Sequence, residues 1–216
     1  MQKFRRAGSG NTGGMNLKSA FSRQFVDVLN SLPDRDFLMA KIAIEAAPTI
    51  AGLKPSSLIT FSTKSRNLHR LWERFKGEGR SFLGLQYSEL KKTESYTLVL
   101  FYRSELLGEV VAQAENVALF DQLGCPCGKS LEQILQHLRD KLEHAFPHEI
   151  GLLLGIPRED VIGFMNKGGS DCLLCGYWKV YHNPVRAVSI FQGYDKAKLR
   201  VMNGICNLSR RKRKSA

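Results

Sequence analysis

The feature that most constrains the fold is an alternation between short apolar runs and longer segments whose apolar residues recur every three or four positions. Short runs bounded by turn residues are typical of strands, and the periodic segments are typical of helices. The alternation predicts an α/β fold, with α+β as the alternative, in which a single mixed sheet of about five strands is flanked by helices. The predicted strands are Ser57–Ser62, Ser81–Tyr87, Tyr96–Arg103, Glu149–Gly155 and Gly176–Tyr181.

These predicted strands differ in the environment that their sequences indicate. Ser81–Tyr87 and Tyr96–Arg103 enclose the polar stretch SELKKTES, an arrangement that allows an antiparallel pair. Glu149–Gly155 reads EIGLLLG, a short continuous apolar run of the kind found in strands that are buried on both faces.

Helical spacing recurs between the predicted strands. The helix after Leu32 is expected to have Asp34 as its N-cap and to end at Pro48. Another helix begins near Pro157, with Glu159 and Asp160 in its first turn. The remaining predicted helices span residues 17–28, 68–75, 107–118, 131–142 and 187–194.

Length and composition predict one domain with two tails. Residues 1–14 read as a disordered basic leader, residues 15–208 as a single globular α/β domain, and residues 209–216 as a basic disordered tail. No apolar run reaches the roughly 20 residues of a membrane span, and the basic start lacks the apolar core of a secretory signal. Five cysteines, an odd number, fit reduced thiols. A cytoplasmic protein that does not bind membranes is therefore expected.

The net charge of +12 is concentrated at the ends of the chain. Lys3, Arg5, Arg6 and the run Arg210–Lys214 supply eight of the 32 basic residues. Without them, 24 basic and 20 acidic residues remain, a net charge of +4. The folded body is thus only mildly basic, and nucleic acid is expected to bind weakly, if at all, through salt-sensitive contacts of the tails.

The stretch LGCPCGKS, residues 123–130, has three interpretations. A phosphate-binding loop needs four residues between its two glycines, and only three separate Gly124 from Gly128. Cys125 and Cys127 offer half of a metal site. In the third interpretation, which we favour, Gly124 ends one helix, and Ser130 begins the next in a capping box with Gln133.

The stretch FPHEIGLLLGIPREDVIGFMNKGG, residues 146–169, and the GYWKVY that follows are the most distinctive parts of the chain. Through them the chain resembles a bacterial family known only as a domain of unknown function, seen mainly in anaerobic Gram-positive bacteria. The motifs are F-P-H-E-I-G-L, L-G-x-P-x-x-D-V-x-G-F and G-Y-W-K-V-Y. AAPTIAGLKPSSLI and YTLVLFYRSELL are also similar, so the resemblance covers most of residues 15–208. Ile156 departs from it, since most members are expected to have Tyr there. The resemblance implies no known activity.

Candidate ligand-binding residues lie at the ends of predicted strands, where α/β sheets place their ligands. His148 and Glu149 stand where a turn enters the predicted strand EIGLLLG, and Lys54 lies in the loop before Ser57–Ser62. His148 is placed to bind a ligand or act in catalysis, and Lys54 could bind an anion. In the alternative interpretation His148 hydrogen-bonds loop backbone, Glu149 pairs with a nearby lysine and Lys54 is solvated.

The segment GYWKVY contributes further candidates. Strand alternation places Tyr177, Lys179 and Tyr181 on one face, and Trp178 and Val180 on the other. In the functional interpretation the first face forms the floor of a site for an anionic ligand. In the structural interpretation Trp178 belongs to the core and the tyrosines lie on the sheet surface.

The cysteines support two further hypotheses. Cys125 and Cys127 together with Cys172 and Cys175 could hold zinc or an iron–sulfur cluster, if the fold brings the two pairs together. Cys175 or Cys172 could act as a nucleophile activated by His148.

We expect instead an intracellular, non-catalytic binding or accessory protein, with a cleft for a small molecule or a protein partner near HEIG and GYWKVY. The cofactor, if there is one, is unknown.

Overall fold

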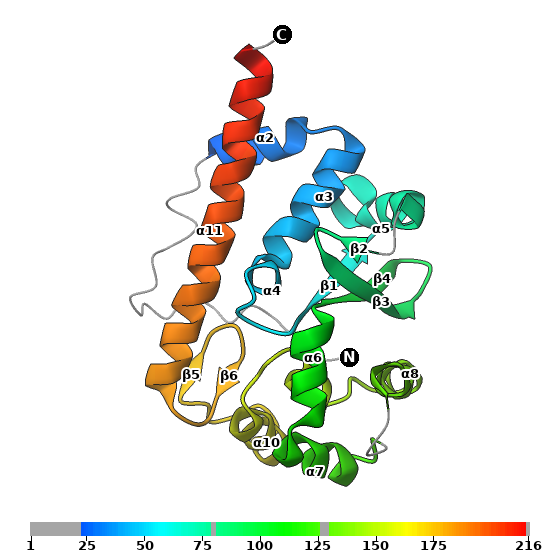
Figure 1. Ribbon diagram of the computed structural model, residues 1–216, viewed down its shortest axis with the longest axis vertical. Helices are drawn as coiled ribbons and strands as arrows, with labels where there is room; N and C mark the ends of the chain where they lie inside the picture. The colour runs from blue at the N-terminus through cyan, green and yellow to red at the C-terminus, as the bar shows by residue number, and fades with distance from the viewer. Residues whose placement is uncertain (1–22, 79–80, 126–129, 215–216) are drawn as a thin grey trace.

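A four-stranded antiparallel sheet lies at the centre of the protein (Figure 1), whose structure is a computed structural model describing residues 23–78, 81–125 and 130–214. The antiparallel pairing predicted for the strands around SELKKTES is confirmed. The predicted strand Ser81–Tyr87 is, however, divided by a turn at residues 83–84, and the strand that begins at Leu85 continues to Lys92, so that only residues 93–95 form the turn to the next strand. In spatial order the strands are β1 (Ser56–Ser62), β4 (Tyr96–Tyr102), β3 (Leu85–Lys92) and β2 (Ser81–Phe82).

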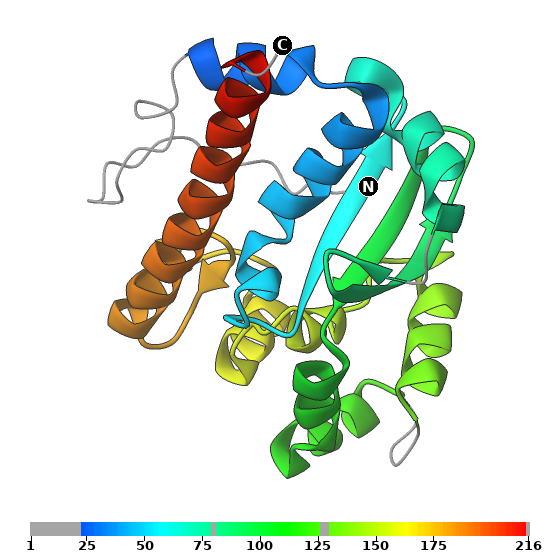
Figure 2. The same cartoon turned by 45° about the horizontal axis from the view of Figure 1, so that its top comes forward.

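Helices cover both faces of the sheet because its central strand β4 is apolar on both sides. Leu98, Leu100 and Tyr102 belong to one hydrophobic core, while Val99 and Phe101 belong to the core on the opposite face. All five side chains are buried. A strand that buries both of its faces fixes a three-layer arrangement of helices, sheet and helices, which Figure 2 shows from a second direction.

The Val99 face packs against two helices from the first half of the chain. They are α3 (Asp34–Glu45) and α5 (Lys64–Phe75), and Trp72 of α5 is fully buried against Phe61 and Phe101. Further elements next to this layer are α2 (Arg23–Ser31), α4 (Ala47–Ile50) and the short 3-10 helix η1 (Lys76–Glu78).

The predicted ends of α3 need correction. Asp34 is the first residue of the helix rather than its cap, and Pro33 occupies the N-cap position. The helix ends at Glu45, and Pro48 lies in the first turn of α4, where its missing N–H leaves no intrahelical hydrogen bond unmade.

The Leu98 face packs against helices from the second half of the chain. They are α6 (Ser104–Ala112), α7 (Ala114–Gln122), α8 (Leu131–Leu142), α9 (Ile150–Leu153) and α10 (Arg158–Lys167). The capping box of α8 is confirmed, since Ser130 accepts a hydrogen bond from the Gln133 N–H and the Gln133 side chain accepts one from the Ser130 N–H. Gly124 follows α7 with a left-handed φ of 72°, as predicted. Gly128 and Lys129 lie outside the described residues.

The predicted strand Glu149–Gly155 is wrong. Its residues form the single-turn helix α9, in which Ile150, Leu152 and Leu153 are all buried. A short run that is apolar on every side satisfies a buried helical turn as well as a buried strand, so its pattern alone does not separate the two.

The predicted strand Gly176–Tyr181 does not join the central sheet either. Its residues 179–180 form β6 (Lys179–Val180), which pairs with β5 (Leu174–Cys175) in a separate two-stranded hairpin. The single five-stranded mixed sheet is therefore corrected to an antiparallel sheet and a hairpin, within a fold of mixed helix and strand.

The last helix, α11 (Pro184–Lys214), runs beside the hairpin and then along α4, α3 and α2 (Figure 1). It is helical through residues 209–214, which the sequence assigns to the tail. Among the described helices, none combines the length and apolarity that crossing a membrane requires.

Candidate functional site

Glu149, a predicted ligand-binding residue, is held by an ion pair inside the protein. Its side chain is 2% exposed, and its Oε1 accepts a 2.7 Å hydrogen bond from Lys141 Nζ of α8. His137 Nε2, also on α8, lies 3.3 Å from the same oxygen. Lys141 further donates a 2.5 Å hydrogen bond to the carbonyl of Leu123, after α7. Glu149 thus fastens the start of α9 to α8 and to the turn after α7.

His148 is exposed and lies beside an aromatic ring of α10. Its ring centroid is 5.9 Å from that of Phe164. The ammonium group of Lys179 lies 6.0 Å from the centroid of the same ring and donates a hydrogen bond to the carbonyl of Gly169. Phe164 therefore joins two residues, His148 and Lys179, that were predicted from separate motifs.

Asp160 organises the hairpin, a role that its sequence position did not reveal. The residue is 1% exposed. Its Oδ2 accepts a 2.7 Å hydrogen bond from Trp178 Nε1, and its Oδ1 accepts hydrogen bonds from the N–H groups of Tyr181 and His182 at 2.7 and 2.8 Å. The sequence signal was an acid in the first turn of a helix, which predicts a favourable helix dipole and not a link to residues about twenty positions away.

The predicted faces of GYWKVY are confirmed for its buried members. Trp178 and Val180 lie in a small core with Ala187 and Tyr194 of α11. Tyr177, however, precedes β6 and packs on α11, where its hydroxyl donates a 2.8 Å hydrogen bond to Asp195.

Cys172 and Cys175 form a close pair of thiols on the hairpin. Their Sγ atoms are 3.6 Å apart, and Cys175 is paired with Lys179 across the two strands. Burial and the neighbouring Cys172 raise the pKa of the Cys175 thiol, while the Lys179 charge opposes this rise. The cation that acts on Cys175 is thus Lys179 and not His148, and the raised pKa is the reverse of what an activated nucleophile needs.

The structure provides no four-cysteine metal site in the part of the chain that it describes. Cys125 is buried in the core beneath α7 and α8, while Cys172 and Cys175 lie on the hairpin. Cys127 lies outside the described residues. Across residues 23–78, 81–125 and 130–214, no three His, Cys, Asp or Glu side chains gather as metal ligands.

Lys54 lies between β1 and α11 without a charged partner. Its ammonium group is 5.6 Å from the centroid of the Tyr194 ring, and no hydrogen bond or ion pair links it to another described residue. Burial and the charge of Lys198 lower the pKa of Lys54 to about 8. Lys198 in turn lies over the Tyr177 ring, 4.9 Å from its centroid. Two lysines and two tyrosines therefore form one cluster, the Lys54 cluster, which only the fold assembles.

The tyrosines of the Lys54 cluster stay neutral in the physiological pH range. Burial raises the pKa of Tyr194 to about 12. Burial, followed by the hydrogen bond to Asp195, raises the pKa of Tyr177 above its usual range. The Tyr194 hydroxyl group can therefore act as a hydrogen-bond donor throughout that range, whereas the single hydroxyl proton of Tyr177 is already donated to Asp195.

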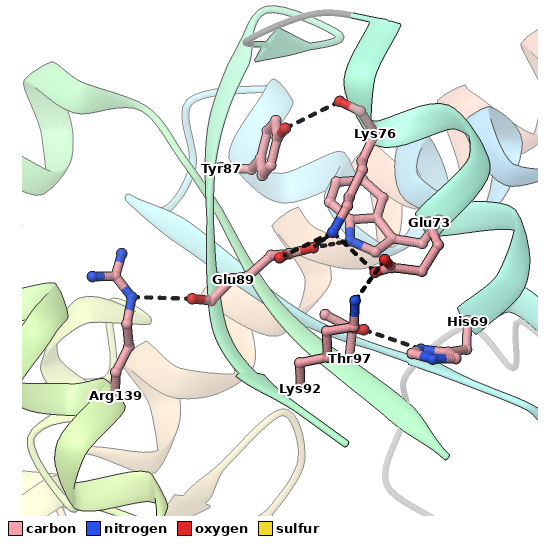
Figure 3. Close-up of polar contacts among 9 residues, drawn as sticks. His69, Glu73, Lys76, Tyr87, Glu89, Lys92, Thr97 and Arg139 are labelled. Atoms are coloured by element: carbon pink, nitrogen blue, oxygen red, sulfur yellow. Dashed lines mark hydrogen bonds and ion pairs between the residues drawn. The ribbon is translucent and has the colours of Figure 1, made fainter. Parts of the chain in front are cut away.

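A second polar cluster, on β3 and α5, is internally satisfied (Figure 3). Glu89 accepts hydrogen bonds from Trp72 Nε1 at 2.6 Å and from Lys76 at 2.9 Å. Glu73 pairs with Lys76 at 3.0 Å and with Lys92 at 2.6 Å. Because each carboxylate already has a cationic partner, this cluster holds α5 against β3 and leaves no charge for a ligand. Of these residues, Glu89 and Lys92 belong to SELKKTES, which was predicted only as a polar stretch between two strands.

The fold and these clusters define a helix-rich protein with a central antiparallel sheet and a hairpin held against its last helix. The chain belongs to the family described as "Protein of unknown function (DUF3793)", whose model matches residues 42–213. The predicted relationship to a domain-of-unknown-function family is thereby confirmed. No curated protein and no solved structure matches the chain.

Proposed function

We propose that the protein is a non-catalytic binding protein that holds a small anion, of the carboxylate or phosphate class, at the Lys54 cluster. The observation that carries the proposal is the position of the Lys54 ammonium group. It is partly buried, it has no anionic partner among the described residues, and the charge that acts on it most is a second ammonium group, that of Lys198.

The electrostatics of the cluster favour an anion. A lysine with a pKa of about 8 is still about nine-tenths protonated near pH 7, so the positive charge is present. Removing an ammonium group from water without a partner costs free energy, and a second cation adds repulsion. An anion between Lys54 and Lys198 would offset both costs through charge-assisted hydrogen bonds.

The surroundings of Lys54 support the same interpretation. Lys54 comes from GLKPSS and Tyr177 from GYWKVY, two segments that carry the family resemblance, and α11 adds Lys198 and Tyr194. Of the residues predicted from sequence, Lys54 is therefore our proposed ligand contact, and Tyr177, whose hydroxyl proton is donated to Asp195, lines the cluster. Glu149 we assign to the scaffold, because Lys141 already neutralises it.

Isothermal titration calorimetry with inorganic phosphate and with succinate tests the proposal. We expect the wild type to bind at least one of them, Lys54→Met to bind at least about tenfold more weakly, and Lys196→Met to bind like the wild type. Lys196 is the control because it is an exposed lysine on α11, the helix that carries Lys198 and Tyr194. Affinity should fall as the pH rises through about 8, where Lys54 loses its proton. Equal binding by all three proteins, or by none, would contradict the proposal.

We also infer a cytoplasmic location in a bacterium. The odd number of cysteines and the close, unbonded thiols of Cys172 and Cys175 suit a reducing compartment. The resemblance to a bacterial family supports the source.

A further inference from the structure

The hairpin presents two thiols at a distance that favours their reaction with each other. Cys172 and Cys175 stand three residues apart, with Leu173 and Leu174 between them, and their Sγ atoms are 3.6 Å apart. A disulfide bond is about 2.05 Å long, so closure needs an approach of roughly 1.5 Å. The strands β5 and β6 contain two residues each, and Cys175 is exposed, so the hairpin can adjust and the thiol can be reached from solvent.

Among the described residues, no metal site forms around the two thiols that would compete with disulfide formation. A structural zinc site needs four ligands, and no third His, Cys, Asp or Glu joins the pair among the described residues. The nearest groups are instead a cation and a phenol. Lys179 faces Cys175 across the hairpin, and the charges of both cysteines affect the pKa of Tyr181.

Tyr181 supplies an independent observation at the same place. Its hydroxyl oxygen is buried and has no hydrogen-bond partner. Burial raises the pKa of Tyr181, and Cys172 and Cys175 are the next causes, so the hydroxyl lies within electrostatic reach of both sulfur atoms. A buried hydroxyl without an acceptor costs free energy, and a thiolate beside it would provide that acceptor.

We propose that Cys172 and Cys175 form a redox-active dithiol that exchanges electrons with disulfides of low-molecular-weight thiols. The Cys175 thiolate attacks one sulfur of the disulfide R–S–S–R, a mixed disulfide forms, and one R–S⁻ leaves and takes up a proton. The Cys172 thiolate then attacks Cys175 Sγ, the intramolecular disulfide forms, and the second R–S⁻ leaves and is protonated. The dithiol loses two electrons and two protons, and the disulfide R–S–S–R becomes two R–SH.

Two neighbouring residues have distinct parts in this exchange. Lys179 opposes the rise in the Cys175 pKa that burial and Cys172 cause, so the first attack is faster with Lys179 than without it. The Tyr181 hydroxyl, which has no partner when both thiols are protonated, would donate a hydrogen bond to a sulfur that carries negative charge, and so favours the reduced form. Neither residue belongs to the proposed contacts of the anion, so the dithiol and the Lys54 cluster can be tested separately.

The test is a redox titration of the full chain against mixtures of glutathione and glutathione disulfide, without oxygen. Samples are quenched with acid, alkylated and mapped by peptide mass spectrometry. We expect one two-electron transition in which Cys172 and Cys175 lose alkylation together and their peptide loses two hydrogens. Cys206→Ser is the control, because Cys206 lies on α11 away from the hairpin, and it should titrate like the wild type.

Variants of the pair and its neighbours sharpen the test. Cys172→Ser should stop at the mixed disulfide on Cys175. In that background Lys179→Met should slow glutathionylation about threefold, because the Cys175 thiolate loses the cation that stabilises it. Tyr181→Phe should shift the midpoint towards easier oxidation. Circular dichroism checks that each variant is folded. If a variant is not folded, the redox titration and peptide mapping of the wild type still test the proposal.

Three outcomes would overturn the proposal. Both thiols could stay alkylatable in excess glutathione disulfide, or a mixed disulfide could accumulate in the wild type without closing. Alternatively, purified protein could contain stoichiometric zinc that blocks alkylation until a chelator removes it, which would assign the pair to a metal site.

Discussion

The carboxylate of Asp160 accepts a 2.7 Å hydrogen bond from the indole nitrogen of Trp178, and both residues are buried. The second oxygen of the same carboxylate accepts hydrogen bonds from two backbone N–H groups after β6. One side chain at the start of α10 therefore fixes the hairpin that carries Tyr177, Lys179 and the thiol pair. Both proposed sites depend on this link for their geometry.

Asp160→Ala is expected to lower the free energy of unfolding by about 3 kcal/mol, because three donors, among them the buried indole N–H of Trp178, lose a charged acceptor. Urea denaturation followed by circular dichroism measures the change. Trp178 should also show altered fluorescence below the unfolding transition, since the hairpin loses its anchor.

Glu159→Ala is the matched control for this substitution. Glu159 lies in the same first turn of α10 but is exposed, so its replacement should change stability by no more than about 0.5 kcal/mol. If both variants lost the same stability, the helix N-terminus rather than the hairpin contacts would explain the effect of Asp160→Ala.

Glu149→Gln should destabilise the protein by about 2 kcal/mol, because the substitution leaves the Lys141 ammonium group without its carboxylate. The loss is moderate because Lys141 is about one-third exposed, so water can partly solvate its ammonium group. Thermal unfolding of Glu149→Gln and Glu143→Gln gives the comparison, since Glu143 is exposed and its 3.4 Å pair with Lys91 should contribute little. Equal losses would show that burial does not distinguish the two carboxylates.

Local signals in the sequence predicted local structure well. Ser130 and Gln133 stand three residues apart before an apolar stripe, and the capping box that they predict is present because its hydrogen bonds depend on neighbouring residues only. The burial of Trp178 and Val180 likewise follows from alternation within one short segment. The helical turn at Ile150–Leu153 could not be distinguished from a strand, because a turn buried on all sides has no polar positions to reveal its period.

The clusters that we propose as sites depend on contacts between distant residues. Lys54 meets Tyr194 across 140 positions of the chain, and no periodicity links them. Asp160 reads as a helix-start acid until the fold places Trp178 beside it. The role of the polar strand β3 could not be predicted for a similar reason, since its charged residues Glu89 and Lys92 are paired with Lys76 of η1 and Glu73 of α5. Sequence predicted several of the residues involved, but their partners required the structure.

Lys54→Met should raise thermal stability near pH 7, with a gain that disappears at higher pH. The pKa of Lys54 is lowered to about 8, so between about pH 8 and 10.4 the unfolded wild-type chain binds more protons than the folded one. The wild type therefore gains stability as the pH rises through that window, and below it the full cost of the buried charge remains. We expect the variant to be more stable by about 1 kcal/mol near neutral pH, after allowance for partial solvation.

Thermal unfolding in phosphate-free buffers near pH 7 and near pH 10 checks this prediction, with Lys196→Met again as the control. The control should show no pH-dependent difference from the wild type, because Lys196 is exposed. A variant that is less stable at both pH values would mean that the Lys54 side chain contributes packing that exceeds the cost of its charge.

Gly163→Ala and Gly108→Ala should change stability in opposite directions, although both glycines lie inside helices. Alanine normally stabilises a helix interior by about 1 kcal/mol relative to glycine, and a Cβ at Gly108 in α6 would meet no atom within 4 Å. A Cβ at Gly163 in α10 would lie 2.5 Å from the Tyr181 side chain, so the hairpin would have to move. We expect Gly108→Ala to raise the midpoint of urea denaturation and Gly163→Ala to lower it by the equivalent of about 1–3 kcal/mol. A stabilising Gly163→Ala would show that the hairpin is not held against α10, and would remove the support that Asp160 gives to both proposed sites.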